Sequence, residues 1–446
     1  MDKIDISMAW SSSGSESSEF SDTTGQLKMC VGETCLTKNE DVWSRTVNDS
    51  VLVSAYPLAL WLASSWWRLN YEALPTSGLV PKIDWRMSHE LGAVNHGYVW
   101  PRVIIASDGE GVKVWAEQGV MQGQSVQYLY GLDVPRVIAL ESFQLCASVF
   151  IESVLGRLNA TGHYDNELAE LWCYVQQGLA DPEMRARRIL EAQMGFDPEE
   201  CPEGILDRAL LLQRMTGAGA MAELAPFIGQ QHMDGQGIPL IDGLVSQSGI
   251  QAHPELPNHF EVTNGRPWQR GRQAAKKLRA AMDNMNKPFK DIDLYHLLGV
   301  TQKQVDGFSI DQQQSVAVIK STESGQISLI PRKRHPVAKR VEYARFIASV
   351  YEVSGSQEGW MVSTDLTTAK QQYQRAFAAE FLCPIDSLLD CLAGDFSESA
   401  REEVADHFGV SEKTVEALLI NNGYLGGSSV ESKVPYQDAS IEARVA

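Results

Sequence analysis

The chain has 446 residues, of which 44% are hydrophobic and 21% are charged. This length allows roughly two to four domains with sizeable cores, and the composition excludes collagen-like, fibrous and wholly disordered proteins. The formal net charge of −19 argues against a protein that wraps nucleic acid over most of its surface, because phosphate binding needs a basic footprint. A local basic patch is still compatible with this charge.

The cysteines and the N-terminus bear on the cellular compartment. The 7 cysteines are scattered and form no CxxC pair, so the sequence predicts reduced thiols in a cytoplasmic protein rather than a zinc ribbon or a disulfide framework. No basic segment precedes an apolar stretch at the N-terminus, and we therefore expect no secretory signal. The uncharged stretch 50–67 is short for a membrane-spanning helix and includes Pro57 and several serines. A buried helix is therefore expected there rather than a membrane span.

The first 134 residues divide into two parts of different composition. Residues 10–24 are rich in serine, glutamate and aspartate and too polar to pack, so residues 1–45 are expected to form a disordered polar head. Residues 46–134 contain several tryptophans and short alternating runs on both sides of the turn-like sequence SDGEG at 107–111. They predict a Trp-rich α+β domain with one hairpin.

The rest of the chain predicts a helical middle and a mixed C-terminal part. Apolar residues at three- and four-residue spacing predict a helical bundle, with a Gly- and Pro-rich loop, over residues 135–260. Residues 261–425 predict a basic amphipathic helix, a hairpin at 315–330 and several further helices. Residues 426–446 are expected to form a disordered tail. The expected fold class is therefore α+β.

The sequence SHELGAVNH at 88–96 draws attention to two histidines. His89 and His96 lie about 10 Å apart along a helix axis, too far to bind one metal ion, so we expect structural or ligand-contacting histidines. The aromatic and charged residues around them favour a Trp-rich core in which the indole and imidazole groups find partners. The alternative is a recognition pocket. The candidate pocket residues are Asp84, Trp85, His89, His96, Trp100 and Asp108.

Residues 402–423 have the spacing of a helix-turn-helix, with the small Ala405, then Gly409, then the apolar Val415. Its second helix offers no arginine that could read a guanine, so DNA binding is possible but not favoured.

Basic residues also surround the strand-to-helix junction PRKRHPVAKR at 331–340. Because the net charge of the chain is negative, we expect these residues to be solvated or paired with acidic side chains of the protein rather than with phosphates. The candidate nucleic-acid contacts are Arg332, Lys333, Arg334, Lys413 and Thr414.

The segment QQYQRAFAAEFLCP at 371–384, followed by VADHFGVSEKTV and LLINNGYL, resembles the end of the ImmA/IrrE metallopeptidase family. In that family, a stretch of the type ExEANxFAAELLMP precedes a small helix-turn-helix. The resemblance covers about residues 265–425 and implies a zincin-like α+β scaffold that ends in a helix-turn-helix. It also implies a zinc site made by an HExxH helix and a third ligand from a later helix, with the Glu as general base.

The positions that should bind zinc have lost their ligand chemistry. Aligning KRVEYARFIASVYE with the family's RRFTLAHELGHLLL places Arg345, Phe346 and Ser349 at the His, Glu and His positions. The third ligand falls at Gln371 or Tyr373. These five side chains cannot assemble a Zn²⁺ site, so we expect no catalytic residue, metal or cofactor in this part of the chain.

The resemblance and its departures favour a non-catalytic, peptidase-like regulatory or scaffold protein. Such a protein would act in a bacterial stress-response, mobile-element or defence system by binding a protein partner, and we expect no membrane partner. One alternative is a metal-dependent peptidase or hydrolase that uses the histidines and acids of residues 84–110, with roles for Asp84, His89, Glu90 and His96. The other is a DNA-binding regulator that uses the helix-turn-helix and the basic clusters.

Overall fold

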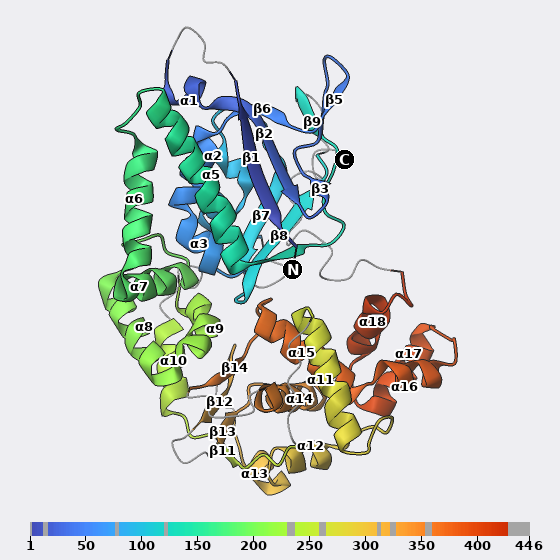
Figure 1. The fold of residues 1–446 in the computed structure, drawn as a ribbon. Helices are drawn as coiled ribbons and strands as arrows, with labels where there is room; N and C mark the ends of the chain where they lie inside the picture. The colour runs from blue at the N-terminus through green and yellow to red at the C-terminus, as the bar shows by residue number, and fades with distance from the viewer. Residues whose placement is uncertain are drawn as a thin grey trace. The chain divides into compact units, whose positions relative to one another are not determined.

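The computed structural model describes residues 2–11, 17–75, 80–119, 124–229, 237–257, 265–309, 314–321, 327–352 and 359–426 (Figure 1). Helices and several small antiparallel sheets make up these residues, which confirms the α+β class. Within the described part of the chain, no helix combines the length and apolar character that crossing a membrane requires. Residues 427–446 of the predicted tail lie outside the description.

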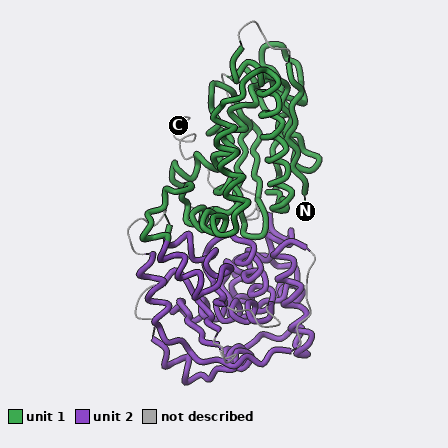
Figure 2. The backbone as a smooth tube through the Cα atoms, turned by 60° about the vertical axis from the view of Figure 1, so that its left-hand side comes forward, with its two compact units in different colours: residues 1–206, 229–231, 431–446 green, residues 207–228, 232–430 purple. Residues whose placement is uncertain are grey.

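The chain forms two compact units (Figure 2). Unit 1 comprises residues 1–206, 229–231 and 431–446, and unit 2 comprises residues 207–228 and 232–430. The division therefore falls inside the predicted helical middle, and neither 134 nor 260 is a boundary. The physical reason is that the first helices of this middle part bury Phe150 and Trp172 in the same core as the N-terminal strands.

The described residues of unit 1 form three small sheets. In the first, β2 pairs with β1, β3 and β6; in the second, β8 lies between β10 and β7; in the third, β4 lies between β5 and β9. The strands are β1 (Ile4–Trp10), β2 (Thr24–Val31), β3 (Thr34–Cys35), β4 (Asn39–Asp41), β5 (Thr46–Asn48), β6 (Val51–Ser54), β7 (Arg102–Ser107), β8 (Gly111–Glu117), β9 (Val126–Tyr128) and β10 (Arg136–Ala139). The β7–β8 pair is the hairpin predicted around 107–111.

The expected disordered head is wrong for the described residues of 1–45. In β1 the sequence IDISMAW alternates, so that Ile4 and Ile6 face the core while Asp5 and Ser7 face outward. Asp22 and Thr23 are also buried, in the serine- and acid-rich stretch that appeared too polar to pack. Residues 12–16 of that stretch lie outside the description.

Helices pack around these sheets. The uncharged stretch at 50–67 begins with β6 and is mostly helical from Tyr56 onward, and Trp66 and Trp67 are almost fully buried, which confirms the expected buried helix for that part. The helices of unit 1 are α1 (Glu19–Asp22), α2 (Tyr56–Ser64), α3 (Trp66–Tyr71), α4 (Ile83–His89), the 3-10 helix η1 (Leu91–Val94), α5 (Leu140–Ala160), α6 (Glu167–Ala180) and α7 (Pro182–Gln193). Helix α8 (Glu203–Thr216) begins in unit 1 and ends in unit 2.

Unit 2 is built on one antiparallel sheet with the order β11-β13-β12-β14. The pair β12–β13 confirms the hairpin predicted at 315–330, of which residues 322–326 are not described. The strands are β11 (Ile250–Ala252), β12 (Ala317–Ser321), β13 (Ile327–Ile330) and β14 (Met361–Ser363). The helices are α9 (Ala218–Ile228), α10 (Gly237–Ser246), α11 (Pro267–Ala281), α12 (Asp291–Leu297), α13 (Gln302–Asp306), α14 (Pro336–Glu352), α15 (Ala369–Leu382), α16 (Ile385–Leu392), α17 (Glu398–Phe408) and α18 (Glu412–Asn421).

Candidate functional site

The centre of unit 2 holds a polar cluster between α14 and α15. Arg345 and Ser349 are one turn apart on α14, and Gln371 and Gln374 are one turn apart on α15, so each pair lies on one helix face. All members of this polar cluster are at most 5% exposed. Its members are Glu223, Arg345, Ser349, Ser363, Thr364, Thr368, Gln371 and Gln374.

Arg345 is the donor at the middle of the polar cluster. Its Nη2 donates to Gln371 Oε1, to Gln374 Oε1 at 3.1 Å and to the Thr364 carbonyl at 2.8 Å. Gln374 in turn donates from Nε2 to Ser349 Oγ at 2.9 Å. The Ser349 hydroxyl donates back to the Arg345 carbonyl at 3.1 Å. The two helices are therefore joined by buried hydrogen bonds among a guanidinium, two side-chain amides, a hydroxyl and backbone carbonyls.

The carboxylate of the polar cluster comes from α9. Glu223 Oε2 accepts from Gln371 Nε2 at 3.0 Å, and Glu223 Oε1 accepts from Thr368 Oγ1 at 2.7 Å. Burial raises the pKa of Glu223, and burial lowers the pKa of Arg345 to about 9. Arg345 and Glu223 are thus linked through the amide of Gln371, which bonds to both.

The structure brings together three of the five residues aligned with metal-binding positions, namely Arg345, Ser349 and Gln371. Phe346 instead packs in the hydrophobic core, with its ring 6.0 Å from that of Tyr343. Tyr373 also lies in the core and not with the polar cluster. Over the described residues, no group of three or more His, Cys, Asp or Glu side chains is placed to hold a metal ion.

The sequence-based prediction missed five members of the polar cluster, namely Glu223, Ser363, Thr364, Thr368 and Gln374. Gln374 follows Gln371 at the spacing of one helical turn in QQYQ, which is a usable signal. Glu223 lies 148 residues from Gln371 in the sequence, and nothing in the local pattern connects them.

Three of the six predicted pocket residues meet in unit 1, with Trp85 and His89 in a packed core and Asp84 partly exposed beside them. The His89 ring stacks on Trp85 with centroids 4.1 Å apart. Its Nδ1 contacts the Ile105 carbonyl at 2.6 Å, and its Nε2 contacts Glu72 Oε2 at 3.0 Å. Arg68, itself buried, donates to Glu72 and to Asp84 and holds this group in place. With both ring nitrogens engaged, His89 fits the interpretation as a core histidine.

The other three predicted pocket residues lie apart, so the six do not form one pocket. His96 is exposed, with its ring 5.4 Å from that of Phe20. Trp100 is buried and donates its indole hydrogen to the Asn95 carbonyl at 2.9 Å. Asp108 caps the β7–β8 turn by accepting from the backbone N–H groups of residues 110 and 111, and burial raises its pKa.

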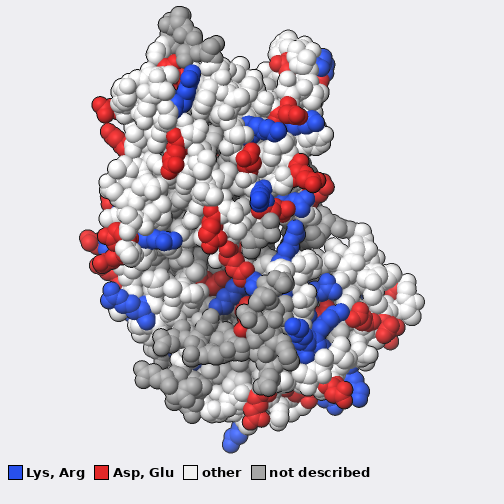
Figure 3. Space-filling view, in the orientation of Figure 1, with Lys and Arg blue, Asp and Glu red and all other residues white. Residues whose placement is uncertain are grey.

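The predicted nucleic-acid contacts do not form one basic surface. Arg332 is buried and bonds to Glu342 and Asp365, so it is unavailable to phosphates, contrary to the prediction. Lys333 lies 3.8 Å from the same Asp365, and Arg334 is exposed. On α18, Lys413 is exposed and Thr414 belongs to the N-terminal cap of the helix. On the face shown in Figure 3, basic and acidic side chains are interspersed.

A Ser–His–Asp group that the sequence did not suggest lies in unit 1. Ser17 Oγ donates to Asp22 Oδ2 at 2.5 Å, and His163 Nε2 lies 2.9 Å from the same oxygen and 3.3 Å from Ser17 Oγ. A catalytic triad needs the two ring nitrogens to face the serine and the carboxylate separately. Here Nε2 faces both, so the geometry is that of a structural contact.

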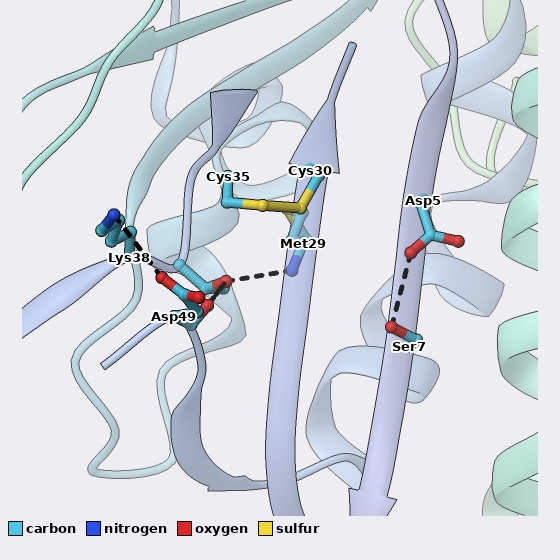
Figure 4. Close-up of a disulfide and its surroundings, with 8 residues drawn as sticks. Asp5, Ser7, Met29, Cys30, Cys35, Lys38 and Asp49 are labelled. Carbon is cyan, nitrogen blue, oxygen red and sulfur yellow. Dashed lines mark hydrogen bonds and ion pairs between the residues drawn. A yellow bond between two sulfur atoms is a disulfide. The ribbon is translucent and has the colours of Figure 1, made fainter. Parts of the chain in front are cut away.

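The structure also corrects the expectation that all cysteines are reduced thiols. Cys30 and Cys35 form a disulfide between β2 and β3 (Figure 4). The two residues are directly opposite in the β2–β3 register, because Val31 pairs with Thr34 across a two-residue turn. A tight hairpin thus brings together cysteines five positions apart, without a CxxC pattern.

Comparison with known proteins gives no relative on which to base a function. The sequence matches no family model, and neither the curated proteins nor the solved structures contain a match to it.

Proposed function

We propose that this protein is a non-catalytic, peptidase-like regulator that acts by binding a protein partner. The proposal places it in the bacterial cytoplasm, in a stress-response or mobile-element defence system, and gives unit 2 a zincin-like scaffold with a helix-turn-helix. The observation that carries it is the hydrogen bond from Arg345 to Gln371, two residues at positions that align with zinc ligands in the ImmA/IrrE family.

The chemistry of the polar cluster supports the absence of a peptidase centre. A guanidinium at the first aligned position repels a divalent cation, and amide and hydroxyl groups offer poor ligands to zinc. The aligned general-base position is Phe346, which is buried in the hydrophobic core and carries no base. A water-activating mechanism therefore has neither its metal nor its base at these positions.

The helices at the end of unit 2 support the helix-turn-helix part of the proposal. Gly409 has a φ of 63°, which turns the chain between α17 and α18. Ala405 and Val415 are buried on the facing sides of these helices. Arg340 on α14 donates from Nε to the Gly409 carbonyl at 2.9 Å and so attaches this turn to the rest of unit 2.

The two alternative functions receive less support. For a metal-dependent enzyme in residues 84–110, His89 is the central candidate, and both of its ring nitrogens already contact oxygen atoms. For a DNA-binding regulator, Arg332 is buried and paired with acids. Neither alternative is therefore preferred over partner binding.

The first test is the metal content of the purified full-length chain, measured by plasma mass spectrometry after chelator-free preparation. We expect less than about a tenth of an equivalent of zinc, and no rise in melting temperature when zinc is added, because a ligand that binds the folded state would stabilise it. Near one equivalent of zinc would contradict the proposal. A His89→Ala variant then distinguishes the sites, since zinc bound in unit 1 would be lost and zinc bound at α14 would remain.

The second test concerns the partner. A protein that copurifies with the chain from its source cells should keep its full mass during prolonged incubation with the purified chain. Time-dependent fragments of that partner, absent from an incubation without the chain, would show that peptidase activity is present and would overturn the non-catalytic proposal.

A further inference from the structure

The disulfide in unit 1 lies at the point where the chain leaves the first sheet to form an additional hairpin. Residues 36–50, which we call the Trp43 arm, connect β3 to β6 and contain the β4–β5 hairpin. Cys35 immediately precedes this arm, and its disulfide partner Cys30 lies on the central strand β2. The disulfide therefore ties the beginning of the Trp43 arm covalently to the sheet (Figure 4).

Besides the disulfide, a few buried hydrogen bonds hold the base of the Trp43 arm. Leu36 donates its N–H to the Met29 carbonyl at 2.8 Å, and Thr37 Oγ1 accepts from the Met29 N–H at 3.1 Å. Thr37 Oγ1 also donates to the Asp49 carbonyl at 3.0 Å, which brings the two ends of the arm together. Asn39 Nδ2 adds donations to the carbonyls of Thr37 and Ser50.

The far end of the Trp43 arm presents a tryptophan to solvent on an ordered turn. Asp41 Oδ1 accepts from the N–H groups of Trp43 and Ser44 at 2.9 and 2.8 Å, which fixes the backbone there. The Trp43 side chain is nevertheless 86% exposed. Such a side chain, on a backbone that is already ordered, can enter a partner's apolar pocket at a low entropic cost.

The disulfide is accessible to a reductant, while three other cysteines are not suited to exchange with it. Cys30 and Cys35 are both half-buried and lie beside the exposed turn at Gly32 and Glu33. In contrast, burial raises the pKa of the thiols of Cys146, Cys201 and Cys383 to about 11, 12 and 12, so they stay protonated and poorly nucleophilic.

We propose that Cys30 and Cys35 form a reversible redox couple, and that its state sets how firmly the Trp43 arm is held to the sheet. A dithiol reductant supplies the reaction: one of its thiolates attacks a cysteine sulfur, and the other cysteine leaves as a thiolate and takes a proton. The second thiol of the reductant then displaces the remaining cysteine and closes the reductant's own disulfide. Two electrons and two protons pass to the cysteine pair, and the arm keeps its hydrogen bonds to β2 and β9 and the buried side chain of Leu36.

The test is hydrogen–deuterium exchange of the full chain, read by mass spectrometry, before and after treatment with dithiothreitol. We expect the amides of residues 36–48 to exchange at least about tenfold faster in the reduced protein, because local opening costs less without the covalent tie. The strands β7 and β8 should keep their exchange rates. Reoxidation should restore slow exchange in the arm.

Two variants serve as the controls. A Cys30→Ser/Cys35→Ser double variant should show the fast exchange under all conditions, whereas Cys173→Ser, which removes an exposed free thiol, should respond to reduction as the wild type does. Thiol labelling of the denatured, unreduced wild type should count five of the 7 cysteines, as the pairing of two requires. Labelling of all cysteines in that sample, or arm exchange that is the same in oxidised and reduced protein, would overturn the proposal.

Discussion

At the scale of single residues, Arg345 shows how a buried charge can hold a protein core together. The residue is 5% exposed, and its guanidinium donates to oxygens on α15 and in the segment before it. Each of those oxygens is itself buried, so it has no water to replace a lost donor. The alignment identified Arg345 as the residue at the first aligned ligand position. The hydrogen bonds that Arg345 makes depend on Gln374 and Thr364, which only the folded chain brings near it.

We predict that Arg345→Ala lowers the free energy of unfolding of unit 2 by about 3 kcal/mol, because several buried acceptors lose their donor at once. Urea-induced unfolding measures this loss. Lys413→Ala is the matched control, since Lys413 is exposed on α18 and its replacement should change the free energy by less than about 0.5 kcal/mol. Equal, small effects of the two variants would show that Arg345 does not organise the polar cluster.

Asp108 gives a prediction about pH. Burial raises its pKa above the ordinary value of 3.8, so the folded state binds this proton more tightly than the unfolded state does. The stability that follows from this preference is fully present below pH 3.8 and is lost as the pH rises through the higher folded value.

Asp108→Asn should remove this dependence, because an amide oxygen can still accept from the N–H groups of Glu110 and Gly111 but carries no charge. We therefore expect the melting temperature of the variant, relative to that of wild type, to increase as the pH is raised from 3.5 towards 7. Differential scanning at several pH values measures it. A difference that stays constant or decreases with pH would mean that burial of the charge is not costly here.

At the scale of the elements, the close packing of α11 against α15 depends on one missing side chain. A Cβ on Gly271 would lie 2.3 Å from the Tyr373 carbonyl oxygen, nearer than atoms can approach. Gly271 therefore sets the separation of the two helices, and α15 carries the glutamines of the polar cluster on another part of its surface.

Gly271→Ala should accordingly destabilise unit 2 by about 1–3 kcal/mol, the usual cost of overpacking. Gly243→Ala in α10 is the matched control, because no atom outside its own helix lies within 4 Å of the new Cβ and alanine is the better helix former. The control should be neutral or slightly stabilising in the same urea experiment. Destabilisation of both variants to the same degree would point to a general intolerance of substitution.

Periodicity predicted the longer elements, and it failed where short polar segments pack. The hairpin of β12 and β13 and the helices of the middle region followed from alternating and helical patterns in the sequence. The strand β1 has an equally regular pattern, but the serine-rich residues after it dominated the prediction of a disordered head. The disulfide between Cys30 and Cys35 depends on strand register, which composition and cysteine spacing do not specify.

At the scale of the whole molecule, the described residues form two compact units, each with a large hydrophobic core, rather than the predicted head and three domains. One core contains buried residues from Ile4 to Ala192, and the other contains buried residues from Ile250 to Leu419. The resemblance covers much of the second core, and local sequence patterns do not specify whether the middle helices join the first. Long-range burial decided that question, and it cannot be read from local patterns.

Arg340 has a consequence for the order in which unit 2 can fold during synthesis. Its guanidinium bonds to Phe289 and Asp291, which precede it, and to Phe408 and Gly409, which follow it. Gly409 lies 69 residues further along the chain, so a ribosome releases α12 and α14 well before the last acceptors exist. The C-terminal helices thus complete unit 2 instead of being added to a finished domain, and a nascent chain must wait for them before this arginine is fully bonded.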